Sequence, residues 1–151
     1  MLCENLKICG IVINGNHIGR TMGFRTANIY FPKNFNKIEN GVYLVKIKYN
    51  EKIYFGISNC GVKPTVSNKD EYLVEVHIFD FNRDIYGENI EIEFLRMIRK
   101  EKKFSSILEL QKQVENDVKT AKKMFGEMWI FVNQVLLDWL VLIIMSLNSI
   151  F

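Results

Sequence analysis

The sequence predicts a mainly β protein, a small antiparallel barrel or sandwich followed by one C-terminal helix. Three observations favour this class. Strand-like segments follow one another at short spacing from residue 8 to residue 98, with no helical pattern between them. Several of these segments alternate apolar and polar residues. A helical repeat of apolar residues then begins near residue 106.

The first strands are marked by the turn residues that end them. The segment "KICGIVI" stops at Asn14-Gly15, and "TANIYF" stops at Pro32, where a polar loop begins. A hairpin follows, with arms Val42–Tyr49 and Ile53–Ser58 joined by a turn at residues 50–52. We expect "CGVKPTV", residues 60–66, to be a loop because it contains Gly and Pro.

The last two strands alternate most clearly. Residues 72–79 place one set of apolar side chains on one face: Tyr72, Val74, Val76 and Ile78. The other face carries Leu73, Glu75, His77 and Phe79. Residues 89–99 repeat the pattern, with Ile90, Ile92 and Phe94 on one side.

A helix is expected after these strands. Ser106 and Glu109 have the spacing of a capping box, in which side chains satisfy backbone donors of the first turn. Apolar residues then recur at steps of three or four: Ile107, Leu110, Val114, Val118, Ala121 and Phe125. Gly126 is a plausible end of the helix.

The segment 129–151 is strongly apolar but contains Asn133, Gln134 and Asp138. Its length suits a membrane helix of about 20 residues, whereas a central Asp costs about 2.5–3.5 kcal/mol on insertion. A packed or dimer-forming helix, a membrane anchor and a non-native extension all remain open, and membrane contact through this tail is unproven.

The whole-chain properties exclude several classes. At 151 residues and 48% hydrophobic composition, we expect one folded domain. The net charge of +3 is too weak to indicate nucleic-acid binding, and we read the run at 99–103 as a solvated face. Cys3, Cys9 and Cys60 have no metal-ligand spacing, so we expect free thiols. Without a signal peptide pattern, a cytoplasmic location is expected.

The stretch "GRTMGFRTANIYFP", residues 19–32, raises the question of a phosphate site. It lacks the spacing of a P-loop and of a dinucleotide fingerprint. Three spaced glycines nevertheless let the backbone approach an anion: Gly15, Gly19 and Gly23. Arg20 adds charge, and Thr26 and Asn28 would share one strand face and offer oxygens to Mg²⁺. From the residues alone, a Gly-rich turn before a solvated strand is the alternative.

Taken together, the ordered blocks resemble the riboflavin kinase (flavokinase) family. They are "GIVINGNHIGRTMGFRTANIYFP", "NGVYLVKI", "ISNCGVKPTV", "VEVHIFDFNRDIYGE" and "FLRMIRKEKKFSSILELQKQVENDVKTAKKMF". The resemblance covers about residues 8–125 and implies a Greek-key-like β-barrel with a C-terminal helix. It divides the chain into a kinase domain, 1–126, and an apolar extension, 127–151. It implies transfer of the γ-phosphoryl of ATP to riboflavin, with Mg²⁺ or another divalent cation.

The resemblance also implies roles for individual residues. Thr26 and Asn28 match the family's metal and phosphate ligands, and Glu75 matches its catalytic carboxylate. The nucleotide-binding loop corresponds to Gly15, Gly19, Arg20 and Gly23. Arg99 and Phe104 match positions near the flavin, although a surface cation and helix packing are the alternatives. We expect His77 to be structural.

The chain departs from the family in one motif position, where Arg25 replaces a Pro. Arginine relaxes the backbone there and adds a charge close to the expected phosphates. With few residues before the kinase signature, we expect FAD synthetase activity to come from another domain or protein. A non-catalytic flavin- or nucleotide-binding module is the alternative function, and a barrel for single-stranded nucleic acid is a weaker one.

Overall fold

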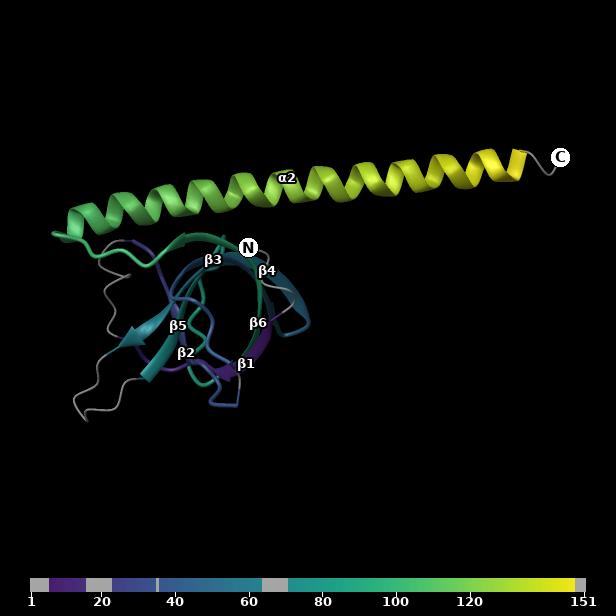
Figure 1. Cartoon of the computed structure of the whole chain (residues 1–151). Helices are drawn as coiled ribbons and strands as arrows, with labels where there is room; N and C mark the ends of the chain where they lie inside the picture. The colour runs from purple at the N-terminus through teal and green to yellow at the C-terminus, as the bar shows by residue number, and fades with distance from the viewer. Residues whose placement is uncertain (1–5, 16–22, 35, 64–70, 149–151) are drawn as a thin grey trace.

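The structure, a computed structural model, describes residues 6–15, 23–34, 36–63 and 71–148. The described residues form six strands and one long helix (Figure 1). They are β1 (Lys7–Ile11), β2 (Ala27–Tyr30), β3 (Gly41–Tyr49), β4 (Lys52–Lys63), β5 (Glu71–Ile78), β6 (Asn89–Lys100) and α2 (Ile107–Asn148). The expected positions Gly19 and Arg20, like Cys3, lie outside the described residues. Cys9 is an exposed free thiol, and the buried Cys60 thiol lies 3.7 Å from the Ser58 hydroxyl.

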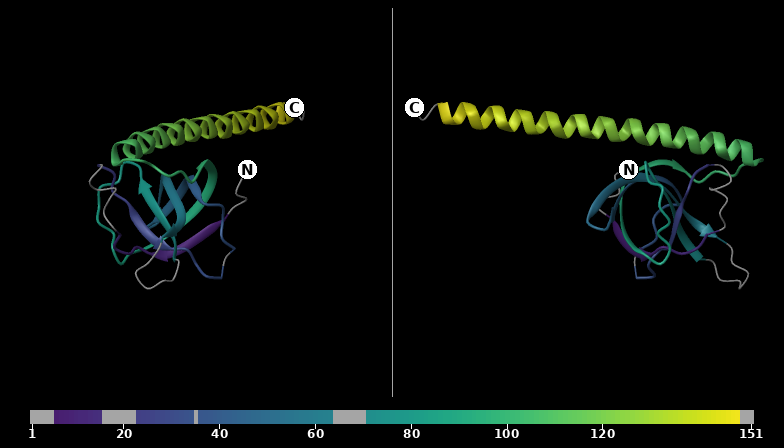
Figure 2. Two further views of the ribbon diagram at one scale, coloured as in Figure 1. Left: turned by 60° about the vertical axis from the view of Figure 1, so that its left-hand side comes forward. Right: turned by 180° about the vertical axis from the view of Figure 1, so that it is seen from behind.

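The strands form one antiparallel sheet in the order β1-β6-β3-β4-β5-β2. Strand β6 returns beside β3 after the β3-β4-β5 meander, which is a Greek-key arrangement. The edge strands meet where the Ile13 N–H donates to the Asn28 carbonyl at 2.8 Å. The sheet is therefore a nearly closed barrel (Figure 2), and the predicted mainly β class with a C-terminal helix is confirmed.

The barrel interior is filled by the faces that the alternation predicted. Four side chains of β5 are buried: Tyr72, Val74, Val76 and Ile78. Ile90, Ile92 and Phe94 of β6 are buried in the same core. Glu75 and His77 lie on the opposite face of β5, which leaves them available outside the core.

Two boundaries differ from the prediction. The β3-β4 turn has two residues, Asn50 and Glu51, with φ of 48° and 60°, and Lys52 already pairs with Tyr49. Two positive φ values match the twist of a tight hairpin. The predicted loop at 60–66 was wrong for its first four residues. These extend β4, because Cys60 and Val62 pair with the alternating strand β5.

Helix α2 begins as the capping pattern predicted. The Ser106 hydroxyl accepts the Glu109 N–H at 3.1 Å, while the Glu109 carboxylate accepts the Ser105 N–H at 2.9 Å. The bonds from Ser105 and the neighbouring Lys102 lower the pKa of Glu109. The predicted stripe packs on the barrel except at Ile107, which is exposed, and Ala121 is fully buried against β3 and β4.

The predicted end at Gly126 was wrong, because α2 continues to Asn148. Glycine weakens a helix by only about 1 kcal/mol, and helix-forming residues flank it on both sides. The first part of α2 lies over the barrel, and the rest projects past it (Figures 1 and 2). The side chains of residues 128–140 are largely exposed, including Trp129, Phe131 and Trp139. Within the described residues, no helix has the length and apolarity needed to cross a membrane.

Candidate active site

The pairing of β2 with β5 brings three of the expected site residues together. Asn28 and Glu75 are directly opposite each other in the two strands. Thr26, directly before β2, donates a hydrogen bond from its Oγ1 to Glu75 Oε1 at 2.8 Å. The alternation of strands thus places two side-chain oxygens and a carboxylate on one face of the sheet.

The side chain of Asn28 is buried with one polar atom left unsatisfied by the described residues. It is 4% exposed, and its Oδ1 has no hydrogen-bond partner among the described residues. A buried acceptor without a partner carries a desolvation penalty of about 1–3 kcal/mol, unless a ligand supplies the missing contact. Gly15 lies against the same side chain, since a Cβ on Gly15 would come within 2.2 Å of Asn28 Nδ2. Position 15 is therefore restricted to glycine as long as Asn28 keeps this place.

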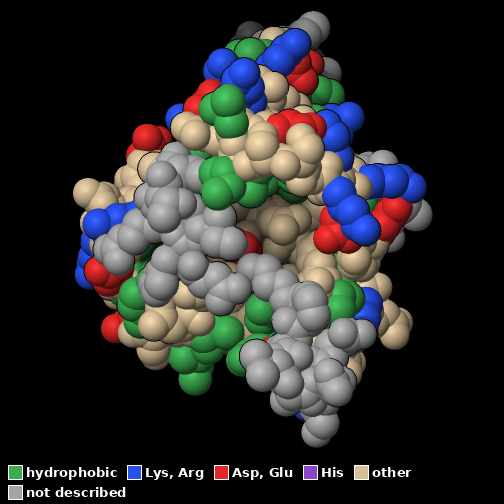
Figure 3. Space-filling model, turned by 90° about the vertical axis from the view of Figure 1, so that its left-hand side faces the viewer, with side chains coloured by type: hydrophobic (Ala, Val, Ile, Leu, Met, Phe, Trp, Pro, Cys, Tyr) green, Lys and Arg blue, Asp and Glu red, His purple; other side chains and the backbone are tan. Residues whose placement is uncertain are grey.

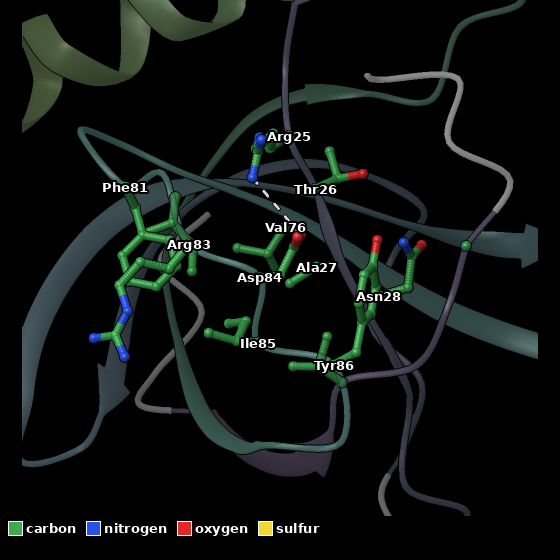
Figure 4. Close-up of a pocket in the computed structure, with 13 residues that line it drawn as sticks. Arg25, Thr26, Ala27, Asn28, Val76, Phe81, Arg83, Asp84, Ile85 and Tyr86 are labelled. Atoms are coloured by element: carbon green, nitrogen blue, oxygen red, sulfur yellow. Dashed lines mark ion pairs between the residues drawn. The ribbon is translucent and has the colours of Figure 1, made fainter. Parts of the chain in front are cut away.

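Two cavities meet at Thr26. The barrel-mouth cavity has a volume of about 40 Å³ and is lined by Gly15, Arg25, Asn28, Asp84 and Tyr86, among others (Figure 4). The helix cavity has a volume of about 300 Å³ and lies between the barrel and the start of α2. Thr26 lines both cavities, and Glu75 lines the second. The Thr26–Glu75 hydrogen bond therefore lies at their common wall.

The helix cavity is mostly apolar, with a few polar groups. Its lining includes Val42 and Ile57 of the sheet and Leu110 and Val114 of α2. Figure 3 shows this face of the molecule hollowed between α2, seen end-on at the top, and the barrel. Ligand pockets typically combine such an apolar lining with a small number of oriented polar groups.

Arg99 and Phe104, which the resemblance placed near the flavin, both line the helix cavity. The Arg99 Cζ is 5.6 Å from the centre of the Phe104 ring. Arg99 donates from Nε to Asp117 Oδ1 at 3.0 Å and from a terminal nitrogen to Asp117 Oδ2 at 2.8 Å. Asp117 is 2% exposed and also accepts a bond from Gln113 at 2.9 Å. A buried carboxylate of α2 thus holds the Arg99 guanidinium in one orientation.

The barrel-mouth cavity is also lined by Arg25. Arg25 NH1 lies 3.7 Å from Asp84 Oδ1, and both side chains are exposed (Figure 4). The Arg25 carbonyl accepts a hydrogen bond from His77 Nδ1 at 2.9 Å, so this ring nitrogen carries a proton. This contact gives His77 a structural role beside Thr26. Gly23, two residues earlier, has φ of +82°, a conformation that favours glycine.

The donor set limits how a metal could bind. Among the described residues, no group of three or more His, Cys, Asp or Glu side chains could hold a metal ion. Asn28 Oδ1 and Thr26 Oγ1 are neutral oxygens, the second of which bonds Glu75. Such a pair fits Mg²⁺ only when the other ligands are phosphate oxygens and waters.

Sequence reasoning missed Asp117, Asn59 and Asp84. Asn59 of β4 is opposite Glu75 and lines the helix cavity, and no pattern in the sequence marked it. Asp117 had a signal: it lies three residues after Val114 and four before Ala121, which places a carboxylate on the apolar stripe.

Comparison with known proteins identifies relatives over most of the chain. A protein-family model described as riboflavin kinase matches residues 2–125. A bifunctional riboflavin kinase/FMN adenylyltransferase of Haemophilus influenzae is 46% identical over 131 residues, which cover 83% of this chain and 42% of that protein. An RNA-binding riboflavin kinase of Bacillus subtilis is 42% identical over 118 residues, covering 78% of this chain and 50% of that protein. The chain therefore spans half or less of the length of these relatives.

Solved structures agree on the fold. A Streptococcus pneumoniae structure described as a macrolide-efflux protein has a TM-score of 0.71 at 35% identity, covering 78% of this chain and 38% of that one. Riboflavin kinase from Trypanosoma brucei has a TM-score of 0.59 at 20% identity, covering 83% of this chain and 82% of that one. At this lower identity, the second structure supports the barrel alone.

Proposed function

The chain belongs to the riboflavin kinase family, and we propose that it transfers the γ-phosphoryl group of ATP to the 5′-hydroxyl of riboflavin, giving FMN and ADP. The observation that carries this proposal is the position of Thr26 and Glu75 at the common wall of two cavities. A transfer between two bound substrates needs such a junction, because the reacting atoms must approach to about 3–3.5 Å.

Each cavity suits one substrate. The helix cavity, about 300 Å³ and mostly apolar, suits the flavin ring, with Phe104 and the fixed guanidinium of Arg99 beside it. The barrel-mouth cavity, with Gly15, Arg25 and Asn28, suits the phosphate end of ATP. The described part of this cavity is small, about 40 Å³. Gly19 and Arg20, which we propose for the nucleotide-binding loop, lie outside the described residues.

Glu75 is the proposed general base. Its carboxylate takes the proton of the 5′-hydroxyl as that oxygen forms a bond to the γ-phosphorus, while the bond from phosphorus to the bridging oxygen of ADP breaks. The hydrogen bond from Thr26 Oγ1 holds the carboxylate at the common wall of the two cavities. Placing a base in this way contributes about 10²–10⁴-fold to the rate.

A divalent cation, Mg²⁺ or another, would be held by Asn28 Oδ1 and Thr26 Oγ1 together with the phosphates. It supplies neutralisation of the phosphate charge when bound. The residues fit this group because the buried Oδ1 of Asn28 has no described partner. Binding would supply the contact that this oxygen lacks.

The proposal concerns the kinase reaction alone, since the matching family model is that of the riboflavin kinases. The second activity named for the Haemophilus relative, FMN adenylylation, is proposed to come from another domain or protein. The absence of nucleic-acid binding stays a prediction, and a cytoplasmic location follows from ATP as the proposed donor.

The test is FMN formation from riboflavin and Mg-ATP, followed by chromatography. We expect the wild type to make FMN, and Glu75→Gln and Thr26→Ala to reduce the rate at least 10²-fold. Glu71→Gln is the matched control, because Glu71 lies on the same face of β5 and lines neither cavity. Riboflavin binding without FMN formation by folded wild type would support a non-catalytic flavin-binding module instead.

A further inference from the structure

Arg25 and Asp84 form an ion pair that a ligand can separate. The two charged groups are 3.7 Å apart, and the side chains are 44% and 61% exposed. Exposed pairs of this kind contribute about 0–1 kcal/mol, because water screens them and two flexible side chains must be ordered. The guanidinium of Arg25 is therefore not committed to Asp84.

The backbone of Arg25, in contrast, is fixed beside the junction of the cavities. Its carbonyl is bound by His77, and the next residue, Thr26, is bound by Glu75 at 2.8 Å. The side chain thus extends from an anchored position while its charged end is free to change partner.

Two described cations line the barrel-mouth cavity, and Arg25 is the one on the side of Thr26. The other described cation in the lining is Arg83, whose guanidinium lies 5.8 Å from the centre of the Tyr49 ring. In Figure 4 the Arg83 guanidinium points to the side opposite Thr26 and Asn28. Of the two described cations that line the barrel-mouth cavity, Arg25 is therefore the one placed to meet an anion beside Thr26.

We infer that Arg25 is a phosphate-binding residue, which exchanges Asp84 for the terminal phosphates of the nucleotide. This inference rests on the proposed function for the identity of its ligand. A guanidinium can bind two phosphate oxygens at once, and such charge-assisted bonds are about twice as strong as neutral ones. Asp84 then competes with the phosphate for the Arg25 guanidinium. When no phosphate is bound, Asp84 holds the guanidinium beside the cavity.

The test is calorimetric titration of the full chain with inorganic tripolyphosphate and with adenosine, both in metal-free buffer. Arg25→Met should weaken tripolyphosphate binding about tenfold and leave adenosine binding unchanged. Arg25→Lys should lose less, because it keeps the charge without the planar fork. Asp84→Asn should strengthen tripolyphosphate binding about threefold, since the competitor is removed.

Arg96→Met is the matched control, because Arg96 is an exposed residue of β6 that lines neither cavity. An equal loss in this variant, an unchanged affinity in Arg25→Met, or no binding by wild type would each overturn the inference. The FMN assay separates it from the proposed function. If Arg25→Met forms FMN with an unaltered KM for ATP, phosphate binding by Arg25 is contradicted and the proposed kinase function stands. If tripolyphosphate binding depends on Arg25 but the wild type forms no FMN, the proposed kinase function is contradicted and phosphate binding by Arg25 stands.

Discussion

The two cavities that meet at Thr26 are built by different means. The barrel-mouth cavity is held by backbone pairing, since the register of β2 with β5 fixes Asn28 opposite Glu75. The helix cavity depends on side chains that attach α2 to the sheet, above all Asp117 to Arg99. We therefore expect substitutions at the barrel-mouth cavity to change the rate of phosphoryl transfer and to leave the free energy of unfolding unchanged. Substitutions in the helix cavity should change both the free energy of unfolding and the affinity for riboflavin.

The largest effect is expected from Asp117→Ala, which breaks the attachment of the helix. Removing one partner of a buried ion pair leaves the other charge uncompensated, so we expect about 3 kcal/mol lower stability in urea unfolding. Riboflavin affinity should fall in the same variant. Asp117→Asn, which keeps one acceptor, should lose less of both. Full stability with weakened flavin binding would show that the two properties of this cavity are separate.

The next effect is expected from Gly15→Ala at the barrel mouth. The new Cβ would meet the Asn28 amide at 2.2 Å and displace it from its place beside Thr26. We expect kcat/KM for ATP to fall about 10²-fold, as for loss of a group that stabilises phosphate charge. Riboflavin affinity, measured by fluorescence, should stay within twofold of wild type. Weakened riboflavin binding would contradict the separation of the two cavities.

A smaller effect is expected from Arg25→Pro, which introduces the residue that the resemblance to the family implies at this position. Proline removes the guanidinium but keeps the carbonyl that His77 binds. We expect the KM for ATP to rise by up to tenfold in steady-state kinetics, with kcat within threefold. A fall in kcat with no change of KM would mean that residue 25 acts through the backbone instead of its charge.

The smallest effect is expected from ending the chain after residue 126. The side chains of residues 128–140 are largely exposed, and none of them lines either described cavity. Barrel stability in urea unfolding should change by less than about 0.5 kcal/mol. FMN formation should be unchanged. A larger loss would show that the division into residues 1–126 and 127–151 is misplaced.

The sequence predicted the features that depend on local pattern. Alternation at Tyr72–Ile78 and the cap at Ser106 are readable because each is set by neighbouring residues. The strand status of Cys60–Lys63 was missed, because it comes from pairing with β5, which Gly and Pro in the local sequence obscure. The helix end predicted at Gly126 was wrong because a single glycine is outweighed when the residues on both sides of it favour helix.

The site was predictable only in part. Thr26, Asn28 and Glu75 followed from the resemblance, and the strand register brings them together. Nothing local to the sequence indicated that Thr26 would lie between two cavities, since the second cavity is closed by α2, more than 80 residues further along the chain. The partnership of Arg25 with Asp84 is likewise a property of two loops in space.

The position of Thr26 at a shared wall has a stereochemical consequence. If each cavity holds one substrate, the phosphoryl group crosses that wall in a single displacement, and no phosphorylated enzyme intervenes. ATP with a chiral γ-phosphorus would then yield FMN of inverted configuration. Initial-rate plots would intersect, since both substrates must be present before either product leaves.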